Sequence, residues 1–271
     1  MEFLKGDCAK ILPELGTEFV DLIVTHPPYD YIRTFDDKLK WDFSIFADIA
    51  RGMEAVLKPG GIIVWVVNDG TIKGSRTGTC FEHALFFKNE LKMRIFDIMI
   101  WRRPNPKFCH AGRYVNCYDY MMVFSKGKPR VANIIKDKPN KFSGSFAQNK
   151  HIRLANGKYA DKGFKKKRIA EFGVRHNIWD INAECGHKMN PERGNHPATF
   201  ALQVATDHIR SWSNPGEIVL DPFMGSGTVG VACAYLDRQF IGIEINGNYI
   251  KAAKKRISMH SKKAQYGRTA G

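Results

Sequence analysis

An apolar run that ends in two consecutive prolines constrains this chain more than any other stretch. Val20 to Val24 is apolar and rich in β-branched residues, which suits a strand buried inside a parallel sheet. Pro27 and Pro28 follow, and neither has a backbone N–H to donate to a strand or a helix. The strand should therefore end in a stiff bend that points a carbonyl, His26 and Tyr29 beyond the carboxyl edge of the sheet. In open α/β sheets, ligands bind at that edge.

Apolar strands and amphipathic helices alternate along most of the chain. Strands are expected at residues 3–4, 20–24, 62–67, 93–101, 118–124, 177–181, 217–220 and 239–244. Helices are expected at 8–15, from Asp42 or Ser44 to a stop at 58–61, and at 79–90, 198–212, 229–236 and 249–260. Strands separated by helices predict an α/β fold with a doubly wound, mostly parallel sheet.

Composition places the chain among ordinary globular proteins. Its hydrophobic content is 44%, and no apolar stretch approaches the roughly 20 residues that cross a bilayer. We therefore expect a soluble, intracellular protein without a membrane partner. Six scattered cysteines include no Cys-x-x-Cys pair, and the spacing of Cys109-His110 and Cys185-Gly186-His187 matches no common zinc module. We expect no metal site.

Positive charge is concentrated in one segment. Residues 126–176 carry 15 basic and three acidic residues, which is +12 of the chain's net +15. This segment has no sustained apolar period, so it is expected to be an insertion. A solvated surface would explain the charge. A nucleic-acid interface would also explain the aromatic residues that alternate with the charges. These aromatic residues are Phe142, Phe146, Tyr159, Phe164 and Phe172.

A glycine-containing loop joins a strand to a helix near the end of the chain. It reads Asp-Pro-Phe-Met-Gly-Ser-Gly-Thr at 221–228, and glycine there lets the backbone approach a ligand at the start of the next helix. The third glycine of the dinucleotide fingerprint and the Gly-Lys-Ser/Thr of a phosphate loop are both absent. Glu244 closes the following strand, where a carboxylate can hold the hydroxyls of a ribose. An ordinary acid at a strand end is the simpler alternative.

Together these motifs resemble those of the S-adenosylmethionine-dependent DNA amino-methyltransferases. Residues 221–228 with Glu244 look like the family's cofactor loop, and Thr25-His26-Pro27-Pro28-Tyr29 looks like its catalytic Asp/Asn/Ser-Pro-Pro-Tyr motif. The catalytic motif comes first, as in the β group of the family, and the resemblance covers residues 2–124 and 177–260.

The resemblance implies a Rossmann-like fold, circularly permuted, with a small basic insertion. The catalytic half would span 1–125, a target-recognition insertion 126–176, the cofactor-binding half 177–260, and a flexible tail 261–271. The cofactor would be S-adenosyl-L-methionine, and the substrate double-stranded DNA. A homodimer and a cognate restriction enzyme are left open as further partners, and the location would be the cytoplasm of a bacterium or of a cell infected by a phage that encodes the protein.

Site residues are carried over from the family motifs one by one. Asp7 would lie near the cofactor adenine and Glu244 would hold the ribose. Thr199 belongs to a segment that contacts the methionine moiety, although the usual Lys-Pro after it is missing. The cofactor set is Asp7, Thr199, Asp221, Pro222, Phe223, Gly225, Ser226, Gly227, Thr228 and Glu244. The catalytic set is His26, Pro27, Pro28 and Tyr29, and the DNA-binding set is Arg33, Lys165, Lys166, Lys167, Arg168 and Arg175.

The chemistry explains why such a motif is needed. The exocyclic amine of adenine or cytosine is a poor nucleophile, because its lone pair is delocalised into the ring. If position 26 and the Pro27 carbonyl accept its N–H groups, the nitrogen becomes tetrahedral and can attack the sulfonium methyl. Tyr29 would stack on the base, which must first be flipped out of the duplex. Adenine N6 is slightly preferred over cytosine N4 as the target.

His26 departs from the family pattern, which has Asp, Asn or Ser at this place. A neutral imidazole has one acceptor nitrogen and an ordinary pKa near 6.5, so it can take the N–H and then remove the proton. It is also bulkier and can become a cation that repels the amine. One alternative is therefore a catalytically impaired DNA-binding protein on a methyltransferase fold. Another is an RNA or protein-glutamine methyltransferase, although the order of the motifs disfavours it.

Overall fold

The computed structural model describes residues 1–28, 41–104, 112–146, 151–161, 168–182 and 200–269. The chain forms two compact units. The larger contains residues 1–133 and 177–271, and the smaller contains residues 134–176. Among the described residues, no helix combines the length and the hydropathy that a membrane span requires.

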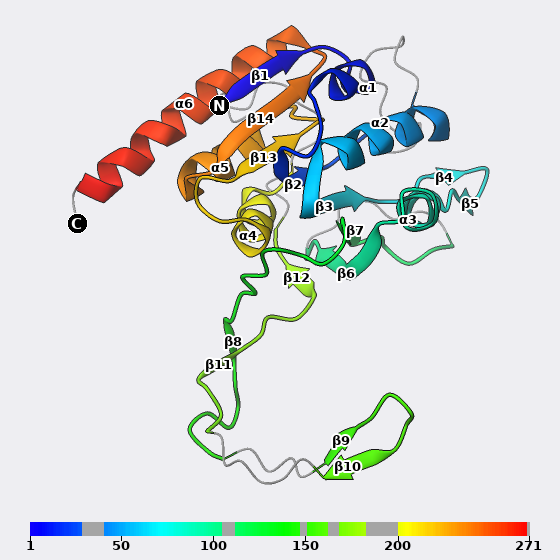
Figure 1. The fold of residues 1–271 in the computed structure, drawn as a ribbon, viewed down its shortest axis with the longest axis vertical. Coiled ribbons are helices and arrows are strands. Elements are labelled where there is room, and N and C mark those ends of the chain that lie inside the picture. Colours follow the sequence, from blue (N-terminus) through cyan, green and yellow to red (C-terminus); the bar gives the residue numbers. More distant parts are fainter. Residues whose placement is uncertain (29–40, 105–111, 147–150, 162–167, 183–199, 270–271) are drawn as a thin grey trace. The chain divides into compact units, whose positions relative to one another are not determined.

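An eight-stranded sheet forms the centre of the larger unit (Figure 1). Its strands are β1 (Glu2–Lys5), β2 (Val20–Thr25), β3 (Leu57–Val67), β6 (Arg94–Arg102), β7 (Tyr118–Ser125), β12 (Ile178–Asp180), β13 (Ile218–Asp221) and β14 (Gln239–Glu244). They lie in the order β1-β14-β13-β2-β3-β7-β6-β12. Only β7 runs antiparallel to its neighbours, which are β3 and β6. The predicted mostly parallel α/β fold is thus confirmed.

Helices cover both faces of the sheet because central strands such as β2 and β3 are buried along nearly their whole length. On one face lie α1 (Cys8–Ile11), the 3-10 turn η1 (Leu12–Glu14), α2 (Phe43–Val56) and α3 (Thr79–Asn89). On the other lie α4 (Leu202–Trp212), α5 (Thr228–Leu236) and α6 (Gly247–Thr269). Asp42 caps α2 by accepting the Ile45 N–H at 3.0 Å, one of the two caps expected from the sequence.

The connections around β2 and β13 create a topological switch point. The chain leaves β2 through α2 on one face and enters β3, whereas it leaves β13 through α5 on the opposite face and enters β14. In open α/β sheets, ligands bind at such a point in a crevice beyond the carboxyl ends of the strands, which here are those of β2 and β13. Both motifs singled out in the sequence begin at this crevice.

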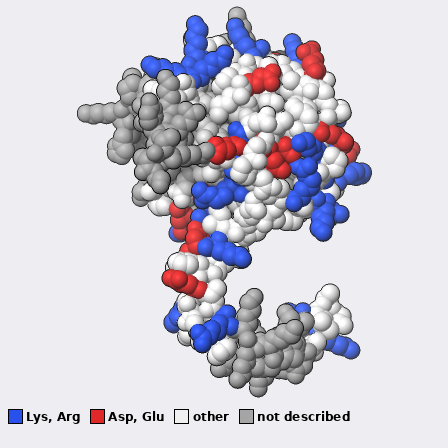
Figure 2. Space-filling model, turned by 60° about the vertical axis from the view of Figure 1, so that its left-hand side comes forward, with Lys and Arg blue, Asp and Glu red and all other residues white. Residues whose placement is uncertain are grey.

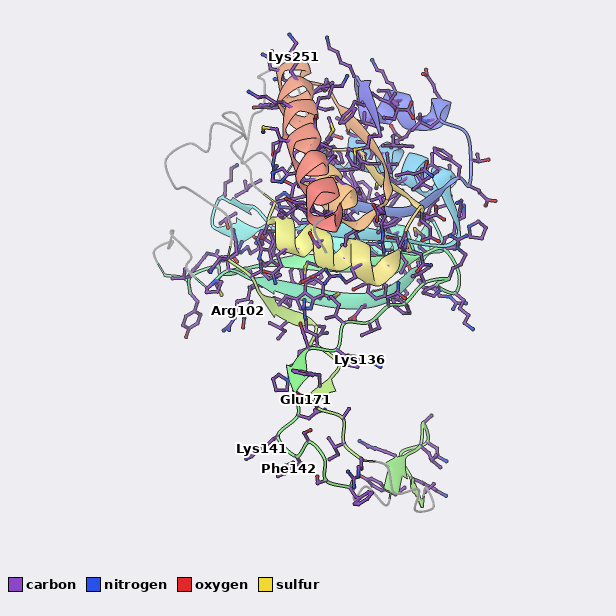
Figure 3. The ribbon with its side chains drawn as sticks, turned by 90° about the vertical axis from the view of Figure 1, so that its left-hand side faces the viewer. Arg102, Lys136, Lys141, Phe142, Glu171 and Lys251 are labelled. Atoms are coloured by element: carbon purple, nitrogen blue, oxygen red, sulfur yellow. The ribbon has the colours of Figure 1, made fainter. Side chains whose placement is uncertain are left out.

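Small sheets complete the described structure. In the larger unit, β4 (Thr71–Ile72) pairs with β5 (Ser75–Arg76). In the smaller unit, β8 (Lys138–Pro139) pairs with β11 (Phe172–Gly173), and β9 (His151–Arg153) pairs with β10 (Tyr159–Asp161), all antiparallel. In the larger unit, the edge strand β12 is joined to β6 by an ion pair in which Arg102 Nη2 lies 2.6 Å from Asp180 Oδ2 (Figure 3 labels Arg102).

Several boundaries differ from those expected. The strand β3 begins at Leu57, because Gly60 and Gly61 exchange backbone hydrogen bonds with Lys126 instead of forming an open turn. The same contacts place residues 126–133 in the larger unit, so the smaller unit begins at Ile134 where the sequence suggested Lys126. Helix α4 begins at Leu202, since Ala201 before it is extended.

The last helix is longer than the sequence suggested. We expected a helix at 249–260 and a flexible tail at 261–271, but α6 runs from Gly247 to Thr269, and Figure 3 labels Lys251 near its start. Residues 261–269 contain no proline, and Lys, Ala, Gln and Arg favour helix, so nothing in them stops the helix at His260. The tail from 261 to 269 is therefore helical.

Candidate active site

The bend after β2 is held by its prolines and by an aromatic contact. Thr25 and Pro27 are buried, whereas His26 is half-buried at the crevice. The imidazole of His26 stacks on Phe200, with ring centroids 5.6 Å apart and planes at 14°. Phe200 in turn meets the buried Trp101 edge-on at 6.1 Å. These contacts fix the plane of the His26 ring, so the imidazole is oriented by the protein.

The loop after β13 is shaped by glycines with positive φ angles. Gly225 has a φ of 50° and Gly227 a φ of 78°, in the left-handed region that favours glycine. A Cβ atom on Gly227 would also lie 2.9 Å from the Ala253 Cβ of α6, so only glycine fits there. Helix α5 begins directly after Gly227, and the first N–H groups of any α-helix have no acceptor within the helix, which suits them to a ligand.

Glu244 holds this loop with both of its carboxylate oxygens. Oε2 accepts the N–H of Gly225 at 2.9 Å, and Oε1 accepts the N–H of Asn246 at 2.8 Å. Burial raises the pKa of Glu244, and these backbone donors oppose that shift. Each oxygen can accept a second hydrogen bond, so the carboxylate remains able to take the two hydroxyls of a ribose. This donor set fits the cofactor expected from the sequence.

Arg256 supports the same loop from α6. Its side chain is buried, and Nη1 donates to the Ser226 carbonyl at 3.2 Å, to Ser226 Oγ at 3.3 Å and to Thr228 Oγ1 at 3.0 Å. A buried guanidinium needs such partners because an unsatisfied charge is costly to bury. The glycine loop is therefore braced from a helix that follows it in the sequence.

Asp221 connects the loop to the bend. Its Oδ1 accepts the Thr25 hydroxyl at 2.7 Å and the N–H of Phe223 at 3.0 Å. Burial raises the pKa of Asp221 to about 7, and the nearby Glu244 carboxylate adds to the shift, whereas its two hydrogen bonds oppose it. This buried contact brings the two sequence motifs together at neighbouring strand ends.

Aromatic residues surround the start of the loop, and Asp7 lies at the next strand end. Phe223 meets Trp41 edge-on at 5.5 Å and Trp65 at 6.3 Å, which gives one wall of the crevice an apolar character. The Gly6 N–H donates to the Glu244 carbonyl at 3.1 Å, and the Asp7 carboxylate caps α1 through the Ala9 N–H at 3.0 Å. This places Asp7 beside the end of β14.

Sequence reasoning missed several residues that shape this site. Thr25 was quoted within the catalytic motif but given no role, and Phe200 and Trp41 were not singled out. Arg256 was hidden among the basic residues of α6. Its position in the helix could have indicated that Arg256 is buried, because it shares the apolar face of the helix with Ala253 and Ile257.

The smaller unit presents aromatic and basic side chains together. Phe142 and Tyr159 are 65% and 72% exposed, and Lys141 Nζ lies 5.7 Å from the centre of the Phe142 ring. Figure 3 labels Lys141 and Phe142 beside each other on this unit, and Figure 2 shows basic side chains on it. Arg168 lies 5.6 Å above the Phe146 ring. Basic and aromatic residues that alternate in the sequence thus contact each other in the folded chain.

Arg175 is engaged within the smaller unit. Its guanidinium forms a two-pronged ion pair with Asp137, with Nε 3.0 Å from Oδ1 and 2.9 Å from Oδ2, and this pair lowers the pKa of Asp137. A phosphate would have to share this guanidinium with a carboxylate. Of these two predicted DNA-binding residues, Arg175 is thus held by a carboxylate, whereas Arg168 contacts a ring.

Some predicted residues lie outside the described part of the chain. These are Tyr29, Arg33, Lys165, Lys166, Lys167 and Thr199, together with the Cys109-His110 and Cys185-Gly186-His187 pairs. Among the residues that are described, no group of three or more His, Cys, Asp and Glu side chains is arranged to hold a metal ion.

Comparison with known proteins identifies the family. The model of the DNA methylase family matches residues 20–255. A relative from Bacillus amyloliquefaciens, the orphan methyltransferase M.BamHII, is 41% identical over 90% of both chains. The Type II methyltransferase M.SmaI of Serratia marcescens is 27% identical over 94% of this chain and 90% of its own.

Solved structures agree in fold. The cytosine-N4-specific PvuII DNA methyltransferase aligns with a TM-score of 0.66 at 18% identity, over 98% of this chain and 92% of its own. The complex of M1.HpyAVI with S-adenosylmethionine aligns with a TM-score of 0.60 at 25% identity, over 94% and 98%. The chain therefore belongs to the DNA methylase family, whose members methylate adenine N6 or cytosine N4 with S-adenosylmethionine as cofactor.

Proposed function

We propose that this protein transfers the methyl group of S-adenosylmethionine to the exocyclic amine of a base flipped out of double-stranded DNA. The observation that carries the proposal is the buried contact between Thr25 and Asp221, which joins the Pro-Pro bend to the glycine loop. A substrate held at the bend and a cofactor held at the loop would meet in the crevice between β2 and β13. Positioning of this kind is the main source of catalysis in a direct group transfer.

Residues at the bend would prepare the amine. The Pro27 carbonyl and the acceptor nitrogen of a neutral His26 each take one N–H, which frees the lone pair of the nitrogen. The cofactor, when bound, supplies a sulfonium methyl whose C–S bond breaks as the new N–C bond forms. His26 then removes the surplus proton, and Tyr29 stacks on the flipped base. The Phe200 stack supports this role because it holds the imidazole in one plane.

Replacement of the bend residues tests this proposal. Purified protein with labelled cofactor should label DNA, and His26→Ala and Tyr29→Ala should each abolish the label. The matched control is His260→Ala, which removes a histidine of α6 in the larger unit. Label that persists in both bend variants would contradict the site. If the wild type is inactive and His26→Asp or His26→Ser gains activity, the chain is instead a DNA-binding protein impaired by His26.

We propose the smaller unit as the DNA-recognition surface. Cations held over exposed rings, as Lys141 is over Phe142 and Arg168 over Phe146, suit a ligand with both phosphates and base faces. Each phosphate contact contributes about 0.9 to the salt dependence of the affinity for duplex DNA. Replacing Lys165, Lys166, Lys167 and Arg168 with glutamine should therefore flatten the slope of log affinity against log salt by about two to four.

The control for that measurement replaces four cations of the larger unit with glutamine, at Lys10, Lys88, Lys92 and Lys73. The same loss of charge should leave the slope nearly unchanged. Equal slopes for the two quadruple variants would show that the smaller unit makes no special phosphate contacts.

We propose adenine N6 as the preferred target base. Modification-sensitive sequencing of DNA from cells that express the protein gives the base, the site and the activity in one experiment. Methylcytosine at the site would overturn the preference while leaving the reaction class intact.

Two partners and a location complete the proposal. For a homodimer, the edge of the sheet offers exposed apolar side chains on neighbouring strands, Ile98 at 47% and Ile178 at 55%. Sedimentation of Ile98→Lys beside the wild type measures whether this surface pairs two copies.

A cognate restriction enzyme would cut unmethylated but not methylated plasmid in an extract of the source cells. The proposed location is the bacterial cytoplasm, which fractionation of those cells tests.

A further inference from the structure

The backbone ladder between β2 and β13 stops before either strand ends. Its last described pair is Ile23 with Leu220, whereas β2 continues in register with β3 as far as Thr25 and Trp65. The last pair therefore lies one residue before Asp221 and two residues before Thr25. Beyond it, the described ladder adds no further backbone pair to set the distance between the catalytic bend and the cofactor loop.

Beyond the last backbone pair, a side-chain hydrogen bond joins the end of β2 to the end of β13. The Thr25 hydroxyl donates to Asp221 Oδ1 at 2.7 Å, and both residues are at least 95% buried. The chain proceeds from Thr25 directly into His26, and from Asp221 directly into Pro222 and Phe223. The same Oδ1 accepts the Phe223 N–H at 3.0 Å, so one oxygen ties the first turn of the loop to the end of the neighbouring strand.

We propose that Thr25 and Asp221 are positioning residues, which set the spacing between the bend that holds the amine and the loop that holds the cofactor. The inference rests on the proposed function, because it assigns the two sides of the crevice to the two reactants. Methyl transfer needs the two reacting atoms in line at a short distance, and an error of about 1 Å can cost about a hundredfold in rate. The hydrogen bond contacts neither reactant and acts through the two segments that do.

The charge of Asp221 should adjust this link. Its surroundings are the Thr25 hydroxyl on β2, the Glu244 carboxylate on β14, the Cys8 thiol on α1 and the Cys233 thiol on α5. Burial raises the pKa of both thiols, so they stay neutral. Asp221 itself titrates near neutral pH, since its pKa is raised to about 7. An ionised carboxylate accepts a stronger hydrogen bond than a neutral one, so the link tightens as pH rises through about 7.

Three substitutions separate positioning from support of the loop alone. Thr25→Val keeps the β-branched shape but removes the donor, and Thr25→Ser keeps the donor. Asp221→Asn keeps an oxygen that can accept both bonds but removes the charge at every pH. For each variant we would measure the single-turnover rate of methyl transfer and the affinity for S-adenosylmethionine, from about pH 6 to about pH 9.

The expected result is a split between rate and affinity. Thr25→Val should lower the transfer rate about tenfold, the effect of losing one hydrogen bond to a charged group, while the cofactor dissociation constant changes less than about twofold. Thr25→Ser should restore most of the rate.

The rise of the wild-type rate through about pH 7 should be smaller in Asp221→Asn. An unchanged rate in Thr25→Val, or a parallel loss of affinity, would overturn the positioning role, and an unchanged pH profile in Asp221→Asn would overturn the part played by charge.

A second measurement decides the inference even if no DNA is labelled. Wild-type protein that binds cofactor but transfers nothing would refute the proposed function alone. In that case, the rate of amide hydrogen exchange is measured for the peptide that covers residues 20–31, with and without S-adenosylhomocysteine. If Thr25 and Asp221 couple the two sides, ligand at the loop should slow exchange at the bend in the wild type and in Thr25→Ser, but not in Thr25→Val. Equal protection in all three would overturn the coupling.

Discussion

The loop after β13 and the bend after β2 end neighbouring strands, yet they are held by different forces. Charged side chains from other elements shape the loop, with Glu244 of β14 and Arg256 of α6 both bonded to it. The bend owes its shape to two proline rings, one hydroxyl and one ring stack. The difference suggests that the loop is sensitive to changes of charge, whereas the bend is sensitive to changes of its own backbone.

The largest effect is expected from removing the carboxylate of the loop. Glu244→Ala leaves the Gly225 and Asn246 N–H groups without their acceptor and removes the predicted ribose ligand. The affinity for S-adenosylmethionine should fall about a hundredfold, measured by titration calorimetry. Glu90→Ala, at the exposed end of α3, should leave the affinity unchanged. A loss smaller than about threefold would mean that charge does not shape the loop.

The pH dependence of stability tests the residue that joins the two regions. The folded protein keeps the Asp221 proton up to about pH 7, whereas the unfolded chain releases it near its ordinary value of 3.8. Stability should therefore fall as pH rises between these values and level off above them. From about pH 5 to about pH 8, the wild type should lose about 2 kcal/mol of unfolding free energy relative to Asp221→Asn, measured with urea. Parallel curves for the two proteins would show that Asp221 is already ionised at pH 5.

A smaller effect is expected from the guanidinium that braces the loop. Arg256→Met keeps most of the volume but leaves the Ser226 and Thr228 oxygens without their donor. The free energy of unfolding should fall by about 1–2 kcal/mol, and the cofactor affinity should fall with it. Lys255→Met, the exposed neighbour on the same helix, is the matched control. If both variants unfold alike, the brace contributes nothing to the loop.

The smallest effect is expected from the proline rings of the bend. Pro27→Ala with Pro28→Ala keeps both carbonyls but frees the backbone, which costs about 0.4–1 kcal/mol. The transfer rate should fall about two- to fivefold while the cofactor affinity stays the same. Pro59→Ala, in the first part of β3, controls for a general effect of losing proline. A loss of cofactor affinity in the double variant would show that the bend and the loop are not shaped independently.

Much of the fold could be predicted from the sequence because local signals agreed with the tertiary structure. Runs such as Val20–Val24 and Gln239–Glu244 are apolar on both faces, and only a strand covered by helices buries both. The extent of α6 could not be predicted in this way. Residues 261–269 favour helix, but lysines mark a solvated surface whether or not the chain is helical, so their composition set no boundary for the helix.

The candidate site was predictable where motif and chemistry coincide. Glu244 and the glycines of the loop were identified because a strand end and a carboxylate define a place for a ribose. Phe200 and Thr25 were not, because their roles depend on partners far away in the sequence. A threonine inside a strand is ordinary, and only its distance to Asp221, 196 residues later, makes it part of the site.

The pairing of β1 with β14 has a consequence for how the protein is made. Lys5 lies opposite Glu244, so β1 can pair with its neighbour only after all the residues between them have left the ribosome. At about 5–20 residues per second, that delay is on the order of tens of seconds. The carboxylate that holds the loop and the arginine that braces it are also made long after β1. A nascent chain therefore cannot complete its cofactor site until β14 and α6 have left the ribosome.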